Sequence, residues 1–219
     1  MSEPLAFRMR PKTLEDYVGQ EHILGKDKLL YRTIKADRLS SLILWGPPGC
    51  GKTSLAKVIS ETTQYKFTRL NAVTSGVGDI KNAVQEADNP LLNPSGKCIL
   101  FIDEIHRFNK LQQDALLPYV ENGTVILIGA TTENPYFEVN KALISRSMVV
   151  KLEPLKKEDI IKVIKRALTA KEGLGGYNIK ISDETIEKVA EISNGDVRTA
   201  LNGLEVATLT TKMNSERSY

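Results

Sequence analysis

The chain has 219 residues, which is enough for one large domain or two modest ones with a sizeable core. Its hydrophobic share of 41% is ordinary for a globular protein, and its net charge of +3 means that any nucleic-acid-binding surface must be local. The two cysteines and two histidines are too few and too scattered for a disulfide framework or the usual zinc spacing, which favours a reduced, cytoplasmic setting.

Residues 1–40 are expected to form an arm followed by short helices. The arm contains three basic residues, Arg8, Arg10 and Lys12. Thr13 followed by Asp16 is typical of a helix start, and the apolar stripe of residues 26–36 indicates a second helix. On composition the basic arm is either a solvated tail or a binding segment.

Residues 41–153 alternate between strand-like and helical patterns. Strands are predicted at residues 41–45, 66–70, 98–102, 125–128 and 148–152. Helices are predicted at residues 53–63, 79–87, 110–120 and 138–144. Unbroken apolar strands alternating with helices indicate an α/β fold, a parallel sheet with helices on both faces. Ligands of such sheets bind at the carboxyl ends of the strands.

From residue 154 onward the strand patterns stop. Three helices are predicted, at residues 157–171, 183–192 and 196–211, with a glycine-rich loop after the first. Residues 154–219 therefore read as a small all-helical second domain.

The first strand and the following helix flank a stretch that reads G-x-x-x-x-G-K-T, the phosphate-binding loop. Its glycines let successive backbone N–H groups point at phosphate oxygens, and the helix dipole favours the same anion. Lys52 would lie between the β- and γ-phosphates of ATP, and the Thr53 hydroxyl would bind Mg²⁺. The predicted cofactor-binding residues here are Gly46, Pro47, Pro48, Gly49, Cys50, Gly51, Lys52, Thr53 and Ser54. The alternative is a glycine-rich turn without a ligand.

The strand at residues 98–102 ends in two acids. Asp103 would reach Mg²⁺ through water, and Glu104 would orient and deprotonate the attacking water. An ordinary acidic turn is the alternative. At the end of the next strand, Thr132 is the candidate for a polar side chain near the γ-phosphate, with Asn134 as second choice; a turn with hydroxyl caps is the alternative.

Two arginines complete the catalytic candidates. Arg146 follows a predicted helix and could act as an arginine finger on a neighbouring subunit's γ-phosphate, or be an ordinary surface arginine. Arg198 lies in the first turn of the last helix, where the dipole disfavours a cation, so pairing with a phosphate is one explanation and a salt bridge is the other.

Taken together, these stretches resemble the AAA+ ATPases. The chain is most similar to the replication-associated recombination protein A family, which is related to the eukaryotic Werner-helicase-interacting ATPase. The resemblance depends most on residues 7–14, 18–22, 103–110 and 129–135. Clamp-loader subunits and the Holliday-junction branch-migration ATPase are similar in outline but fit these stretches less well.

The resemblance implies a DNA-dependent ATPase that acts in replication-fork maintenance, recombination and repair, with ATP and Mg²⁺ as cofactors. Gapped, forked or single-stranded DNA ends would be partners, along with single-stranded-DNA-binding protein. The family forms homo-oligomers, usually tetramers, with ATP between subunits, so Arg146 would act in trans. By the same resemblance, Arg8, Tyr17 and Val18 would border the nucleotide.

Some implied roles depend on position more than on a sharp motif. Asn71 would restrain Glu104 until DNA binds, and DNA would contact residues 76–78 and Lys81 in a central channel. The basic flank of the first lid helix is read instead as a solvated face. Cys50 is either a small residue that fills the loop or an oxidisable thiol.

Two further functions stay open: a clamp-loader-like or branch-migration ATPase, and a nucleotide-gated scaffold with little turnover. No apolar run approaches the ~18 residues of a membrane span, and no signal peptide is evident, so a cytoplasmic, nucleoid-associated protein without a membrane partner is expected. Family members continue past the lid, so the sequence is expected to be part of a longer protein.

Overall fold

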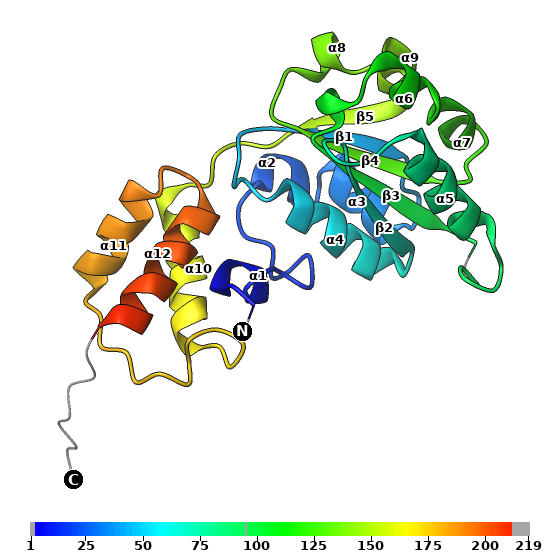
Figure 1. Cartoon of the computed structure of the whole chain (residues 1–219). Helices are drawn as coiled ribbons and strands as arrows, with labels where there is room; N and C mark the ends of the chain where they lie inside the picture. Colours follow the sequence, from blue (N-terminus) through cyan, green and yellow to red (C-terminus); the bar gives the residue numbers. More distant parts are fainter. Residues whose placement is uncertain (1–2, 95, 212–219) are drawn as a thin grey trace. The chain divides into compact units, whose positions relative to one another are not determined.

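The computed structural model describes residues 3–94 and 96–211 and divides into two compact units (Figure 1). Pro11–Glu153 form an α/β unit. Residues 154–211 form a helical unit together with residues 3–10. The first residues thus pack with the lid helices rather than with the rest of the expected segment 1–40.

The α/β unit contains a five-stranded parallel sheet in the order β2-β3-β4-β1-β5. Its strands are β1 Ser41–Trp45, β2 Lys66–Asn71, β3 Cys98–Asp103, β4 Ile126–Thr131 and β5 Ser147–Lys151. The predicted fold class is confirmed. β4 extends beyond its predicted end because Thr131 still pairs with Trp45 of β1. The carboxyl ends of these two strands therefore lie at the same edge of the sheet.

Apolar clusters cover both faces of this sheet. On one face, α3 (Leu29–Lys35) and α4 (Lys52–Thr63) pack against side chains such as Leu44 and Phe101. On the other face, α5 (Val77–Asp88) packs against Ile43 and Leu100. Since both faces are buried, the inner strands β1, β3 and β4 are apolar at almost every position, whereas the edge strands β2 and β5 are more polar.

The shorter helices differ from the sequence prediction. They are α2 Glu21–Leu24, the 3₁₀ turn η1 Ile105–Arg107, α6 Lys110–Asp114, α7 Leu117–Glu121, α8 Pro135–Glu138 and α9 Lys141–Ile144. Residues 13–16 form a turn and no helix, although the Thr13 hydroxyl accepts from Asp16 N at 3.1 Å as a cap would.

Two predicted helices are each divided in two. The stretch 110–120 breaks between α6 and α7, where Pro118 lies in the first turn of the new helix and cannot donate a backbone hydrogen bond. The predicted helix 138–144 is wrong in its first half, because Asn140 is extended and its side chain accepts from Ala142 N at 2.8 Å, which starts α9 there.

The helical unit consists of α1 (Leu5–Arg8), α10 (Lys157–Thr169), α11 (Asp183–Ile192) and α12 (Val197–Thr210). α1 packs against α12, and the three long helices pack against one another. Among the described residues, no helix has the length and hydropathy needed to cross a membrane.

Candidate active site

The loop Gly46–Thr53 connects β1 to α4 at the carboxyl edge of the sheet. Gly49 and Gly51 have φ values of +73° and +103°, which lie in the left-handed region that glycine tolerates best. Lys52 is buried, and its Nζ donates to Gly46 O at 2.6 Å and Pro47 O at 2.8 Å. The lysine ammonium therefore lies inside the curl of the loop.

Tyr17 supports this loop from the segment before α2. Its hydroxyl donates to Gly51 O at 3.2 Å, and a Cβ on Gly51 would lie 2.4 Å from that hydroxyl. Burial raises the pKa of the Tyr17 phenol, so it stays neutral and keeps its proton for this hydrogen bond. The neighbouring Val18 is half-buried.

Gln20 is a site residue to which the sequence pattern assigns no role, although it lies within the stretch 18–22. Its buried amide Nε2 donates to Cys50 O at 3.3 Å and Glu153 O at 2.7 Å, and its Oε1 accepts from Glu153 N at 3.0 Å. One side chain thus ties the loop to Glu153, the second residue after β5. A buried glutamine with both ends satisfied is visible only in the structure, because its partners are backbone groups far along the chain.

Asp103 ends β3, and its Oδ2 accepts from Arg69 Nη2 at 2.5 Å. Arg69 comes from β2, two residues before Asn71, which is paired with Asp103 in the sheet. No motif in the sequence points to Arg69. Asn71 Oδ1 accepts from Val73 N at 2.9 Å, so its side chain closes its own turn, and no hydrogen bond joins it to Glu104 among the described residues.

Glu104 has φ +55° and ψ +45°, the left-handed region, which costs a non-glycine residue roughly 1–2 kcal/mol. Its carbonyl accepts from Arg107 N at 2.8 Å, which closes the turn η1. The conformation turns the carboxylate away from the line of β3, where it faces His106 with Oε2 3.5 Å from Nδ1. A conformation that is strained in this way at a candidate base is a pointer to function.

The end of β4 is the third part of this edge. Thr131 is buried, and its hydroxyl contacts His106, whereas Thr132 is half-buried and has no side-chain hydrogen bond among the described residues. Asn134, the second choice for this role, accepts from Tyr136 N at 3.1 Å and caps α8. Thr132 therefore stays the candidate for contact with the γ-phosphate, and Asn134 is committed to the cap.

Arg146 lies on the surface after α9. Its Nη2 is 2.6 Å from Glu121 Oε1, and its Nη1 donates to Ala142 O at 2.9 Å. Because exposed ion pairs are weak, this arginine can exchange its partner for a phosphate at little cost.

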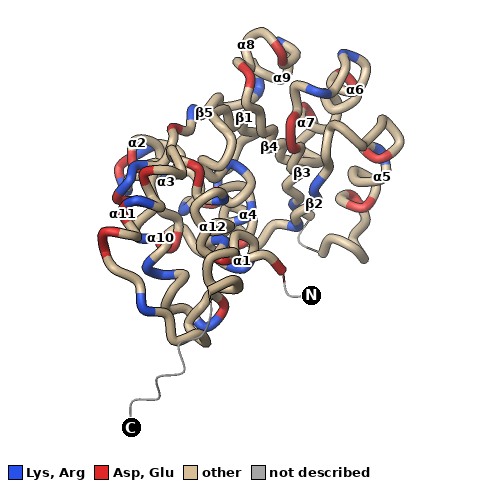
Figure 2. The backbone as a smooth tube through the Cα atoms, turned by 60° about the vertical axis from the view of Figure 1, so that its left-hand side comes forward, with Lys and Arg blue, Asp and Glu red and all other residues tan. Residues whose placement is uncertain are grey.

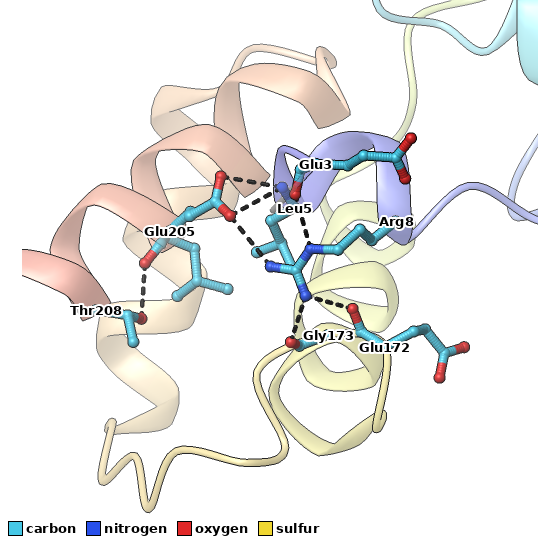
Figure 3. Close-up of polar contacts among 8 residues, drawn as sticks. Glu3, Leu5, Arg8, Glu172, Gly173, Glu205 and Thr208 are labelled. Atoms are coloured by element: carbon cyan, nitrogen blue, oxygen red, sulfur yellow. Dashed lines mark hydrogen bonds and ion pairs between the residues drawn. The ribbon is translucent and has the colours of Figure 1, made fainter. Parts of the chain in front are cut away.

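The remaining arginine candidates belong to the helical unit. Arg8 on α1 donates to Glu172 O, Gly173 O and Glu205 Oε1, the last at 3.1 Å (Figure 3). Its guanidinium thus contacts the loop after α10 and α12 in this structure. The exposed Arg198 lies in the first turn of α12, where the Asp196 side chain accepts from its backbone N–H at 2.8 Å. Its side chain has no ion pair with any described residue, so the alternative of a salt bridge is not observed there.

The candidate DNA-contacting segments are also visible. Residues 76–78 begin α5, where Gly76 N donates to Asp79 Oδ2 at 2.7 Å, and Lys81 is exposed on the first turns. The lysines of α10 are interspersed with acids on α10 and α11 (Figure 2). Three of them form ion pairs: Lys157 with Glu187, Lys162 with Asp159 and Lys165 with Asp183.

Cys50 is 1% exposed and packs in the apolar cluster beneath the loop. A thiol buried in this way fills space, and its burial argues against ready access for an oxidant.

The groups at this edge fit Mg²⁺ and a nucleoside triphosphate. The hydroxyl of Thr53 and the carboxylate of Asp103 are the hard oxygen ligands that Mg²⁺ prefers. Gly46 has no room for a side chain, because a Cβ there would lie 2.4 Å from the backbone oxygen of Leu152. The cationic Lys52, the two acids Asp103 and Glu104, and a helix N-terminus all lie at the carboxyl edge of a parallel sheet. Together they define a P-loop nucleoside triphosphate hydrolase.

The family comparison agrees with this class. Residues 42–154 match the model described as "ATPase family associated with various cellular activities (AAA)", and the chain belongs to that family. Membership implies nucleotide binding and, in general, ATP hydrolysis.

Curated relatives narrow the resemblance. The chain is 52% identical over 205 residues to the Escherichia coli K12 protein named "Replication-associated recombination protein A", covering 93% of this chain and 46% of that protein. It is 48% identical over 215 residues to the Bacillus subtilis protein of the same name, covering 98% and 50%. "ATPase WRNIP1" of Dictyostelium discoideum is 47% identical over 216 residues, covering 99% and 24%. The expected resemblance is confirmed, and the chain spans half or less of the length of these relatives.

A solved structure has the same fold. The Thermotoga maritima RuvB Holliday junction branch migration motor superposes with a TM-score of 0.72 at 29% identity, covering 89% of this chain and 63% of that one. A point mutant of the same protein gives 0.74 at 26% identity, covering 94% and 70%.

Proposed function

We propose that the chain is the ATP-hydrolysing module of a DNA-dependent, Mg²⁺-requiring ATPase that acts in replication-fork maintenance, recombination and repair. The observation that carries the chemistry is the convergence of the loop after β1, the acids after β3 and the threonines after β4 at one edge of the sheet. The observation that carries the biological role is the identity of about half of all residues with proteins named for replication-associated recombination.

In the proposed mechanism, the loop amides and the Lys52 ammonium bind the β- and γ-phosphates. Thr53 would hold Mg²⁺ directly and Asp103 through water, and the bound ion would neutralise phosphate charge. Glu104 holds the attacking water and accepts its proton. Thr132 orients the γ-phosphate, while Arg146 and Arg198 stabilise the charge that develops there.

The proposal includes assembly. ATP would bind between subunits of a homo-oligomer, a tetramer in the longer protein, with Arg146 acting on the neighbour's nucleotide. Arg8, Tyr17 and Val18 would border the nucleotide, with Asn71 restraining Glu104. DNA would contact residues 76–78 and Lys81, single-stranded-DNA-binding protein would be a partner, and the protein would be cytoplasmic and nucleoid-associated.

Steady-state ATPase activity tests the proposal. The 219-residue chain and the E. coli relative are compared, each with and without gapped or forked DNA. DNA-stimulated turnover supports the proposal, and turnover that ignores every DNA structure contradicts the DNA-dependent part. Glu104→Gln is expected to bind ATP but not hydrolyse it, and Lys52→Ala to lose binding as well. Retained turnover in Glu104→Gln would show that Glu104 is not the base.

A branch-migration ATPase is the second candidate, because the chain shares its fold with the T. maritima motor. Strand-exchange assays on four-way junctions separate it from a fork-directed ATPase. A nucleotide-gated scaffold is the third candidate. The acid at position 104 argues against it, since a protein that only binds ATP has no need of a base there.

A further inference from the structure

Between the candidate base and the end of β4 lies a histidine that the proposed mechanism does not use. The side chain of His106 is 8% exposed, and its Nδ1 is 2.9 Å from Thr131 Oγ1 and 3.5 Å from Glu104 Oε2. Thr131 itself is fully buried. One ring nitrogen thus faces both a buried hydroxyl and a carboxylate whose side chain is about one-third exposed.

The hydrogen-bonding capacity of Thr131 decides where the histidine proton lies. The hydroxyl can accept two hydrogen bonds and donate one. Its oxygen accepts from Glu133 N at 3.0 Å and lies 3.4 Å from Glu133 O. If the hydroxyl donates to Glu133 O, it has one lone pair left for His106, and Nδ1 must carry the proton.

The carboxylate requires the same tautomer. With the proton on Nε2, the Nδ1 lone pair would point at the Glu104 oxygen, and two acceptors would face each other at 3.5 Å. With the proton on Nδ1, the ring donates to Thr131 and is attracted to the carboxylate at the same time. Of the two neutral tautomers, only the one with the proton on Nδ1 satisfies all four contacts.

Thr131 also contacts the phosphate-binding loop. Its carbonyl accepts from the N–H of Gly46, the first loop residue, at 3.2 Å, and its neighbour across the sheet is Trp45 of β1. A single residue therefore holds the start of the loop through its backbone and His106 through its side chain.

We propose that His106, as its Nδ1–H tautomer, is a positioning residue that fixes the Glu104 carboxylate relative to the phosphate-binding loop through Thr131. The inference rests on the proposed role of Glu104 as the base. In this role His106 acts through Glu104 and not on the nucleotide itself. It restricts the rotamers of an acid that the left-handed backbone at position 104 has already turned out of the strand.

The tautomer is tested first, by ring ¹⁵N NMR of the 219-residue chain with labelled histidine. The chain has only one other histidine, His22, so a His22→Asn variant assigns both sets of signals. A protonated-type Nδ1 and a bare-type Nε2 at neutral pH are expected for His106. The opposite pattern would overturn the assignment, whatever the activity of the protein.

The positioning role is tested by paired substitutions in the ATPase assay. Thr131→Val removes the hydroxyl at constant shape and Thr131→Ser keeps it; His106→Phe removes the nitrogens and His106→Asn keeps a donor near the place of Nδ1. We expect kcat to fall roughly 10- to 100-fold in the first of each pair, with ATP affinity unchanged, and the second of each pair to recover much of the loss. His22→Asn is the control and should match wild type.

The outcomes separate the inference from the proposal beneath it. Wild-type turnover in Thr131→Val and His106→Phe, with an inactive Glu104→Gln, overturns the inference alone. Equal losses within each pair also overturn it, since they indicate a packing defect, which thermal unfolding would reveal. Retained turnover in Glu104→Gln overturns the role of Glu104 and the inference with it.

Discussion

At the scale of single residues, Gln20 shows how the phosphate-binding loop depends on a side chain outside it. Its backbone has φ +60°, so the chain turns sharply before α2 and directs the amide inward. The amide then donates to the loop at Cys50 O and makes a two-way pair with the backbone of Glu153. The loop is tied in this way to the segment that follows β5.

Replacing Gln20 by leucine should destabilise the α/β unit. Three hydrogen bonds are lost, of which the one to Cys50 O is buried and the two to Glu153 are partly buried, so we expect the free energy of unfolding to fall by about 3 kcal/mol. Urea denaturation measures the change, and ATP affinity should fall with it because the loop loses a support. Gln85→Leu, on the exposed side of α5, is the matched control. A loss of less than about 1 kcal/mol would contradict the role given to Gln20.

At the scale of elements, two polar contacts attach secondary structures that are distant in the sequence. The first joins α1 to α12: both oxygens of Glu205 accept from Leu5 N at 3.0 Å, and one also contacts Arg8 (Figure 3). The side chains of Arg8 and Glu205 are only 24% and 19% exposed, so this pair is better shielded than a surface salt bridge.

Arg8→Met should therefore loosen α1 from the helical unit. We expect a loss of about 1–3 kcal/mol in the free energy of unfolding and faster hydrogen exchange at Leu5, because the guanidinium makes charge-assisted bonds that methionine cannot replace. Lys188→Met breaks an exposed pair with Glu184 on α11 and is the control, expected within about 0.5 kcal/mol of wild type. If both variants lose the same free energy of unfolding, the contact between Arg8 and Glu205 stabilises the fold no more than an exposed ion pair does.

The second contact joins the end of α3 to the starts of β2 and β3. Asp37 accepts from the Tyr65 hydroxyl and from Lys97 Nζ, the latter at 2.9 Å. The hydrogen bond from Tyr65, and then that from Lys97, lower the pKa of the Asp37 carboxyl. The same lysine has a raised pKa, because of its hydrogen bonds with Tyr65 and Asp37.

The direction of these shifts predicts a pH dependence. A carboxyl whose pKa is lower in the folded state stabilises the fold above its unfolded pKa of about 3.9, and the gain is lost as pH falls through the folded value. Asp37→Asn should thus lower the free energy of unfolding at pH 7, and the two proteins should converge in acid. Denaturation at a series of pH values measures this, with Asp88→Asn as the exposed control. A constant difference down to the lowest pH would show that the lost charge is not the cause.

At the scale of the whole molecule, Arg146 is the residue whose role depends on assembly. Its present partners, Glu121 and the end of α9, lie in its own chain, and the ion pair is half-exposed. An arginine so placed costs little to release. It can complete a neighbour's site if a head-to-tail interface brings that site near.

Mixing two inactive variants tests this. Glu104→Gln lacks the base and Arg146→Ala lacks the finger, so each alone should show little turnover. In a 1:1 mixture of head-to-tail rings, about a quarter of the interfaces combine an intact base with an intact arginine, so about a quarter of wild-type activity should return. Each of the two variants can also be mixed with Lys52→Ala as a further comparison. No recovery in the Glu104→Gln and Arg146→Ala mixture would argue that Arg146 acts within its own chain or not at all.

The sequence by itself determined the parallel sheet, the glycine-rich loop after β1 and the pair of acids at the end of β3. Each depends on local information: an apolar run that fits a strand, glycines that permit φ above zero, and a fixed spacing from Gly46 to Lys52 and Thr53. It also identified α10, α11 and α12 to within a few residues, because caps such as Ser182 and Asp196 are visible in the sequence. These signals involve neighbours within one or two turns of the chain.

Only the tertiary structure decided which residues support these motifs. Gln20 meets residues 30 and 133 positions away, and Thr131 meets His106 across 25 positions, so no local pattern contains them. The same holds for α1, which reads as part of an arm but lies on α12, where the carboxylate of Glu205 binds its first N–H group. The physical reason is that sheet register and helix packing bring distant residues together. The sequence contains both residues of each contact, but no local pattern shows that they meet.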